Sequence, residues 1–103
     1  TWTVTVLESV LESGIPVTTC LRYSYPNPFN PATTIVFDLA RASNVKLSVY
    51  NINGQLVDVL QDGSLPAGYH SLTWRPVELS SGVYLLEMET GEYRTVQKMT
   101  FVK

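Results

Sequence analysis

Residues 45–61, VKLSVYNINGQLVDVLQ, carry the pattern that decides the fold. From 45 to 50, apolar and polar residues alternate, which places every second side chain on one buried face of a β-strand. Asn53-Gly54 follows, and this dipeptide favours a type I′ hairpin turn because both central residues of that turn need positive φ. The run from 55 to 61 is rich in Leu and Val and ends at Asp62-Gly63. The stretch therefore predicts a β-hairpin.

The same alternation continues on both sides of this hairpin. Residues 34–39 alternate before it, and residues 69–74 alternate after it until Pro76, which cannot donate to a sheet ladder. The remaining strands are predicted at 17–22, 83–90 and 93–102. Short strands with turn signals about every 8–12 residues predict an all-β fold, namely an antiparallel β-sandwich.

Composition limits the partners of this domain. The chain has 103 residues, of which 45% are hydrophobic and 16% charged, with a net charge of −2. This length predicts a single globular domain. The seven Lys and Arg residues are scattered, which argues against a nucleic-acid partner because phosphate contacts dominate such binding. No apolar run approaches the ~20 residues that a membrane-spanning helix needs.

The chain holds one histidine, His70, and one cysteine, Cys20. Catalysis by a Ser–His or Cys–His pair needs the imidazole beside a nucleophile and an orienting group. His70 instead alternates with Leu72 and Trp74, so we expect it to pack against the core. Cys20 cannot form an internal disulfide, and a free cysteine is usually a small buried hydrophobe. A zinc site would need further ligands from scattered carboxylates.

The acidic residues give no catalytic pattern. Glu87 and Glu89 stand two apart on one predicted strand, with about 7 Å between their Cα atoms, near the carboxyl separation of inverting glycosidases. They also fit a solvated strand face, and we take that interpretation. Asp38, Asp58 and Asp62 lack the spacing of a calcium loop, and no glycine-rich phosphate loop is present. The sequence therefore predicts no catalytic residue, no metal and no cofactor.

The aromatic residues leave an alternative function open. Six tyrosines and two tryptophans are enough to form a carbohydrate-binding face on a sandwich. Strands also favour aromatic residues for packing reasons alone, and Trp74 and Tyr84 fall on predicted core faces. An Ig-like accessory or carbohydrate-binding module of a secreted enzyme is therefore the alternative function.

The first residues follow a different pattern. Residues 2–6 alternate as in a strand, whereas the apolar residues between 7 and 11 fall at helical spacing. Two interpretations stay open: the end strand of an upstream domain followed by a linker, or an extra strand of the sandwich. A third idea treats this strand as a link to neighbouring subunits in an assembly, with Trp2, Val4 and Val6 as the inserted face. We favour the first, which divides the chain into an upstream segment, 1–13, and a domain, 14–103. Because the chain begins at Thr1 without the features of a signal peptide, we expect a longer polypeptide.

Three prolines fall within six residues in the segment Tyr25–Pro31, YPNPFNP. Each proline fixes its own φ and biases the preceding residue toward extended geometry. Asn27 and Asn30 can cap local turns through their side chains. The segment therefore predicts a stiff loop leading into the next strand, with Phe29 as its anchor in the core. A polyproline ligand for another domain is the competing interpretation.

From Tyr25 to Leu39 the sequence resembles the opening of the C-terminal sorting domains of the bacterial type IX secretion system, which are common on secreted proteins of Bacteroidetes. The resemblance covers about residues 16–103, and the general pattern is shared with the flagellar hook-capping Ig-like domain. One departure is Arg75-Pro76, where relatives usually have an acidic residue or Asn followed by Gly, which puts the turn geometry there in doubt. The residues that carry the resemblance are Pro26, Asn27, Pro28, Phe29, Asn30, Pro31, Gly54, Gly68, Trp74, Gly82 and Tyr84.

The resemblance implies a seven-stranded antiparallel Ig-like β-sandwich that acts as a secretion address and performs no catalysis. An upstream cargo domain in the same polypeptide would be carried through the outer-membrane translocon to the cell surface or into the medium. A sortase-like peptidase would then remove the domain. We expect this cleavage between residues 7 and 17, in an exposed linker of the kind that proteases favour.

We predict that the last strand carries recognition by the translocon. Its end places basic and apolar groups together, at Lys98, Met99, Phe101, Val102 and Lys103. An edge strand can be recognised by β-augmentation, in which backbone pairing gives affinity and alternate side chains give specificity. Met99 and Phe101 also fit an ordinary core strand, and both interpretations can hold together.

Overall fold

The computed structural model describes residues 15–103, which fold into seven β-strands and, within that range, no helix. The all-β prediction is therefore confirmed, and no helix of the described residues could cross a membrane. The strands are β1 (Cys20–Tyr25), β2 (Thr33–Leu39), β3 (Ser43–Asn51), β4 (Leu56–Leu65), β5 (Gly68–Trp74), β6 (Gly82–Glu89) and β7 (Arg94–Phe101).

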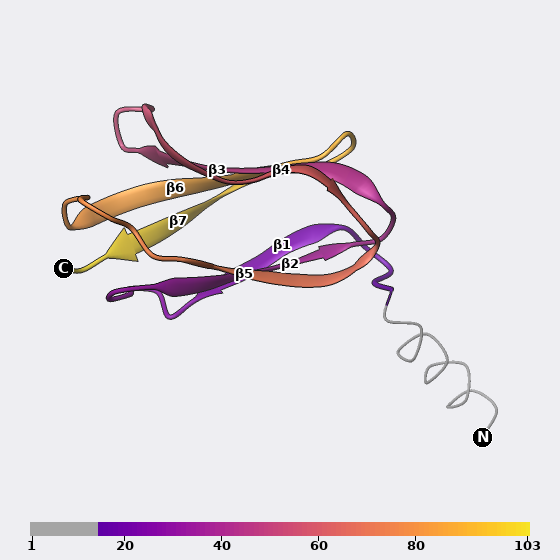
Figure 1. Ribbon diagram of the computed structural model, residues 1–103, viewed down its shortest axis with the longest axis horizontal. Helices are drawn as coiled ribbons and strands as arrows, with labels where there is room; N and C mark the ends of the chain where they lie inside the picture. The colour runs from indigo at the N-terminus through magenta and orange to yellow at the C-terminus, as the bar shows by residue number, and fades with distance from the viewer. Residues whose placement is uncertain (1–14) are drawn as a thin grey trace, which may run out of the picture.

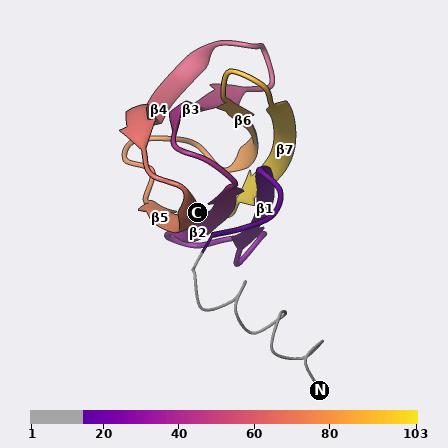
Figure 2. The same cartoon turned by 90° about the vertical axis from the view of Figure 1, so that its right-hand side faces the viewer.

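The strands form two antiparallel sheets that face each other (Figure 1). One sheet has three strands in the order β1-β2-β5, and the other has four in the order β4-β3-β6-β7. Figure 2, which views the molecule from one end, places β1 beside β7 where the sheets meet, and the Gln97 side chain joins them there by donating to the Leu21 carbonyl at 3.2 Å. The seven-stranded sandwich is thus confirmed.

The core lies between the sheets and follows the alternation predicted from the sequence. The inward residues of the central strands are fully or almost fully buried: Ile35, Phe37 and Leu39 of β2; Val45, Leu47 and Val49 of β3; and Tyr84, Leu86 and Met88 of β6. These strands each have a neighbour on both sides in their sheet, so their inner faces are covered by the opposite sheet along most of their length.

The β3–β4 hairpin forms, but its turn differs from the predicted type I′. Gly54 has φ of 81°, whereas Asn53 does not have positive φ. The backbone N–H of Gly54 donates to the Asn51 carbonyl at 3.0 Å, and the Asn51 side-chain oxygen accepts from the N–H groups of Asn53 and Gln55. The Asn51 side chain therefore organises a longer loop, in which only the glycine needs the left-handed region.

Two strand boundaries also differ from the prediction. β4 does not stop at Asp62-Gly63 but continues to Leu65, because Gly63 pairs with Val45 inside the ladder. β1 begins at Cys20 and not at Val17. Its partner strand β2 ends at Leu39, and the Thr19 hydroxyl accepts from the next backbone N–H, that of Ala40, at 2.9 Å. β2 therefore offers no backbone partner for residues 17–19 in the sheet.

Glu87 lies on the outer face of its sheet, as predicted, but it is not solvated: it is buried there, whereas Glu89 is exposed. β6 lies between β3 and β7, and each neighbour covers the Glu87 carboxylate with one side chain. Arg94 of β7 donates from Nε to Oε2 at 2.6 Å, and the Tyr50 hydroxyl of β3 donates to Oε1 at 3.3 Å. This carboxylate is therefore held in a structural ion pair.

Replacing Leu86 tests the core. Leu86 is fully buried, so Leu86→Ala should lower the free energy of unfolding by about 2–5 kcal/mol through lost burial and a residual cavity. Val77 lies in an exposed loop, so Val77→Ala should change the free energy of unfolding by no more than about 0.5 kcal/mol. Urea denaturation measures both. Equal effects of the two substitutions would show that the sheets do not pack as described.

Candidate recognition site at the last strand

An aromatic cluster joins four segments that are far apart in the sequence. Phe29 of the proline-rich loop stacks on Phe101 of β7, with ring centroids 5.1 Å apart, and lies 5.6 Å from the Trp74 ring. Trp74 in turn meets the edge of the Tyr84 ring at 5.9 Å. All four rings are buried. Phe29 is therefore the predicted anchor, and it holds the loop against the last strand.

The backbone of Phe29 also pairs with β7. Its N–H donates to the Thr100 carbonyl at 2.9 Å, and its carbonyl accepts from the Val102 N–H at 3.0 Å. Phe29 and Phe101 form an isolated parallel bridge. The loop thus behaves as a one-residue strand added to the outer edge of the four-stranded sheet.

The Asn27 side chain extends this pairing by one further step. Its amide nitrogen donates to the Lys98 carbonyl at 2.9 Å, and its amide oxygen accepts from the Thr100 N–H at 3.0 Å. A side-chain amide has an N–H donor group and a C=O acceptor side by side, as a peptide group does. It can therefore take the place of a backbone partner in a sheet. The proline-rich loop therefore satisfies backbone groups of Lys98, Thr100 and Val102 along this edge.

This pairing bears on the predicted recognition by β-augmentation, which stays a prediction. β-Augmentation along residues 98–102 would need backbone groups that Asn27 and Phe29 already occupy. Met99 and Phe101 are buried, so their side chains are inaccessible as well. Of the five predicted recognition residues, the structure exposes the side chains of Lys98, Val102 and Lys103.

The other motif residues divide into two groups. Pro26, Pro28, Asn30 and Pro31 are exposed in the loop around Phe29, and the peptide bonds that precede the three prolines are cis. Gly54, Gly68 and Gly82 lie in a turn or at the start of a strand and do not join the aromatic cluster. The motif therefore combines an aromatic cluster and its loop with glycines in turns and at strand starts.

Two hydrogen bonds orient the remaining rings of the cluster. The Trp74 indole N–H donates to Asp58 Oδ2 of β4 at 3.0 Å, and the Tyr84 hydroxyl donates to the Ser80 carbonyl at 2.7 Å. Ser80 belongs to the loop that begins at Arg75-Pro76, the turn whose geometry the sequence left in doubt. In this loop Glu78 has φ of 61°, the only positive φ of a non-glycine residue between 15 and 103. The hydrogen bond from the Tyr84 hydroxyl thus connects this loop to β6.

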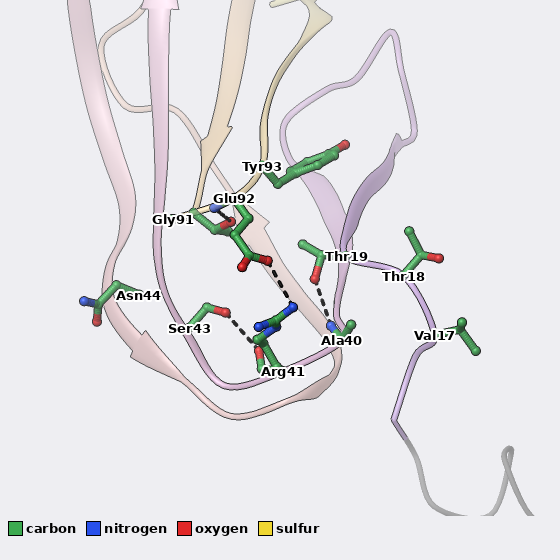
Figure 3. A pocket seen from close by; sticks show the side chains of 11 residues that line it. Val17, Thr18, Thr19, Ala40, Arg41, Ser43, Asn44, Gly91, Glu92 and Tyr93 are labelled. Carbon is green, nitrogen blue, oxygen red and sulfur yellow. Dashed lines mark hydrogen bonds and ion pairs between the residues drawn. The ribbon is translucent and has the colours of Figure 1, made fainter.

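The opposite end of the sandwich carries a hollow of about 480 Å³, shown in Figure 3. Residues 17–19 pass along it on their way into β1. Arg41 and Glu92 point toward each other across it and form an ion pair at 3.2 Å, which joins the β2–β3 loop to the β6–β7 turn. Both side chains are exposed, so this pair adds little stability.

His70 and Cys20 occupy structural positions. The His70 ring stacks on Phe37 at 5.2 Å, and its Nε2 lies 2.8 Å from the Pro66 carbonyl oxygen, which confirms the expectation that it packs against the core. Burial raises the pKa of the Cys20 thiol above its usual value, and the neighbouring Asp38 carboxylate raises this pKa further. A thiol with a raised pKa is a poor nucleophile at neutral pH. Residues 15–103 contain no cluster of three or more His, Cys, Asp or Glu that could hold a metal.

Sequence reasoning missed the function of Asn27. The signal was an asparagine between two prolines, neither of which has an N–H group to offer a neighbouring strand. The side-chain amide of Asn27 supplies that donor.

The two asparagines of the motif provide a matched test. Asn27→Ala removes two hydrogen bonds to β7 and should lower the free energy of unfolding by about 1–3 kcal/mol. Asn30 is exposed and makes no such bond within residues 15–103. Asn30→Ala should therefore change the free energy of unfolding by less than about 0.5 kcal/mol. Chemical denaturation measures the difference. Equal stabilities of the two variants would contradict the role assigned to Asn27.

Comparison with known proteins identifies the family. A model of the family described as "secretion system C-terminal sorting domain" matches residues 23–103, which is most of the chain and includes the aromatic cluster and all of β2–β7. No curated protein and no solved structure matches the chain. Domains of this family are sorting signals without catalytic activity. The type IX secretion machinery recognises them and exports the cargo protein to the cell surface or into the medium. The chain belongs to the secretion system C-terminal sorting domain family, and it is a sorting signal for type IX cargo.

Proposed function

We propose that the translocon recognises this domain as a folded unit, through the exposed side chains at the end of the last strand. Lys98, Val102 and Lys103 make the contact, whereas Met99 and Phe101 fix the strand in the core. Two observations support this assignment: the backbone edge at 98–102 is paired with the proline-rich loop, and the side chains that remain accessible are basic or apolar. Recognition by these side chains needs an intact loop, which explains why the motif and the last strand belong to one signal.

We further propose that the cargo is released at the other end of the domain. The described residues extend over 53 Å along their longest axis, and Figure 1 shows that the chain enters the sandwich at one end and finishes at the opposite end. A translocon bound at the finishing end would leave the entering end accessible to a sortase-like peptidase. An upstream cargo domain would precede the domain that we place at residues 14–103.

The expected cleavage region, 7–17, lies mostly outside the described residues, as does the face of Trp2, Val4 and Val6. Its described part is Ile15–Val17, in which Ile15 and Val17 are exposed and Pro16 is buried. Cleavage before Pro16 would leave the buried part of this segment with the domain. The mass of the exported cargo would locate the cleaved bond.

A reporter protein fused to residues 14–103 tests recognition in a host with a working type IX system. Deletion of residues 98–103 would also remove the buried Met99 and Phe101, so substitutions are the sharper tool. The triple variant Lys98→Gln, Val102→Ser, Lys103→Gln should lower the amount of exported reporter about tenfold, which corresponds to about 1.4 kcal/mol of binding free energy.

The matched control for this experiment changes exposed side chains of the same kinds elsewhere. Arg75→Gln with Val77→Ser lies in the loop before β6, and export of this control should stay within about twofold of the unchanged fusion. Export of the triple variant at the level of the control would refute recognition by Lys98, Val102 and Lys103.

A second candidate function has one observation in its favour. Tyr23, Tyr25 and Tyr69 are exposed on the outer face of the three-stranded sheet, where flat rings can stack on sugars. A carbohydrate-binding module would show saturable glycan binding that is lost in Tyr23→Ala and Tyr25→Ala. Unchanged binding in these variants, or no binding by the isolated domain, would eliminate this candidate.

A further inference from the structure

The outer face of the four-stranded sheet carries exposed aliphatic side chains. Leu56 of β4 is 54% exposed and Val96 of β7 is 51% exposed, and Val59 of β4 and Ile52 of the β3–β4 turn are also exposed. Exposed apolar side chains that cluster in one patch mark an interaction site more often than scattered ones do. The strand register shows whether these residues cluster.

The register places the apolar side chains in two adjacent rows across the sheet. In the first row, Leu56 pairs with Tyr50, Tyr50 with Leu85, and Leu85 with Lys98. In the second row, Val59 pairs with Ser48, Ser48 with Glu87, and Glu87 with Val96. We call the apolar members of these rows and the adjoining turn the aliphatic half-face: Tyr50, Ile52, Leu56, Val59, Leu85 and Val96.

The next row of the same face is charged, which limits the half-face to one end of the sheet. In that row Asp62 pairs with Lys46, Lys46 with Glu89, and Glu89 with Arg94. This row lies on the side of the β6–β7 turn. The aliphatic half-face lies on the other side, where β7 ends and Val102 and Lys103 follow (Figure 1). It therefore continues the surface to which we assign recognition.

A shallow hollow of about 320 Å³ opens on this half-face. Its lining includes Tyr50, Leu85 and Val96, together with the Glu87–Arg94 ion pair. The Glu87 carboxylate is already bonded to Arg94 and to the Tyr50 hydroxyl, so this polar group needs no partner from outside. The hollow thus combines apolar surface from Tyr50, Leu85 and Val96 with an ion pair that is already satisfied.

Lys98 supplies the charge at the edge of the half-face. Its side chain is exposed, and within residues 15–103 it forms no ion pair. Charges across an interface are usually complementary, so this unpaired cation beside an apolar surface favours a partner with a carboxylate. Apart from Tyr50, the side chains of the half-face are branched and aliphatic. Such a surface fits protein side chains better than sugar rings, which stack on flat aromatic faces.

We propose that the aliphatic half-face is the docking surface for a protein component of the type IX machinery, whose contacting surface is apolar and places a carboxylate opposite Lys98. This proposal rests on the proposed function, and it extends the recognition surface from the end of β7 across the sheet to β4. The domain would therefore be recognised by a sheet face, which exists only when β4, β3, β6 and β7 are assembled in register.

The test replaces one residue on each edge strand of this sheet by threonine, which preserves strand propensity. Leu56→Thr with Val96→Thr should lower export of the reporter fusion about tenfold. The control is Tyr23→Thr with Tyr69→Thr on the outer face of the other sheet, where the side chains are 50% and 51% exposed. Export of this control should stay within about twofold of the unchanged fusion. Thermal unfolding of each purified domain checks that both double variants are folded.

The outcomes separate this proposal from the one on which it rests. Loss of export in both the Leu56/Val96 pair and the Lys98/Val102/Lys103 triple, with the tyrosine pair retained, supports the half-face. Loss in the triple alone overturns the half-face and leaves recognition at the end of β7 intact. Full export of the triple overturns both.

A second variant guards against an effect of folding. Lys98 is exposed, so Lys98→Glu should leave the domain folded, yet it places a negative charge against the expected carboxylate. Its export should fall below that of Lys98→Met, which removes the charge without reversing it. Equal export of these two variants would overturn the carboxylate partner.

Discussion

The contact between Phe29 and Phe101 is the interaction on which the rest of the structure depends. It joins a loop between β1 and β2 of one sheet to the edge strand of the other sheet. Trp74 packs against Phe29, and Tyr84 packs against Trp74, so the end of β5 and the start of β6 meet beside this contact. Buried aromatic pairs of this kind contribute about 0.5–1.5 kcal/mol beyond their area. Four sequence motifs that look unrelated along the chain are therefore one cluster in space.

This cluster determines how the domain can be recognised. An unpaired edge strand invites pairing with other chains, and proteins cover such edges to prevent aggregation. Here Asn27 and Phe29 cover the edge at residues 98–102. The recognition that we propose therefore uses side chains, at the end of β7 and on the outer face of its sheet. If these proposed surfaces are the signal, recognition requires a folded domain, because an unfolded chain presents neither surface.

The sequence was sufficient to predict that seven strands form and which of their side chains are buried in the core. Residues such as Leu47 and Leu86 alternate with polar neighbours, and a period of two fixes which side chains are buried. The turn at Asn53-Gly54 and the burial of Glu87 could not be predicted, because each depends on one partner side chain, Asn51 or Arg94. The covered edge depends on contacts between residues more than 70 positions apart. Local patterns do not carry that information.

Amide hydrogen exchange measured by NMR tests the central claim, that the proline-rich loop covers the outer edge of β7. The Thr100 and Val102 N–H groups donate to the Asn27 side chain and to the Phe29 carbonyl, so both should exchange slowly. Val96 lies on the same side of the strand by alternation, beyond the residues that the loop reaches, and its amide should exchange rapidly. Exchange of Thr100 and Val102 as fast as that of Val96 would contradict the account.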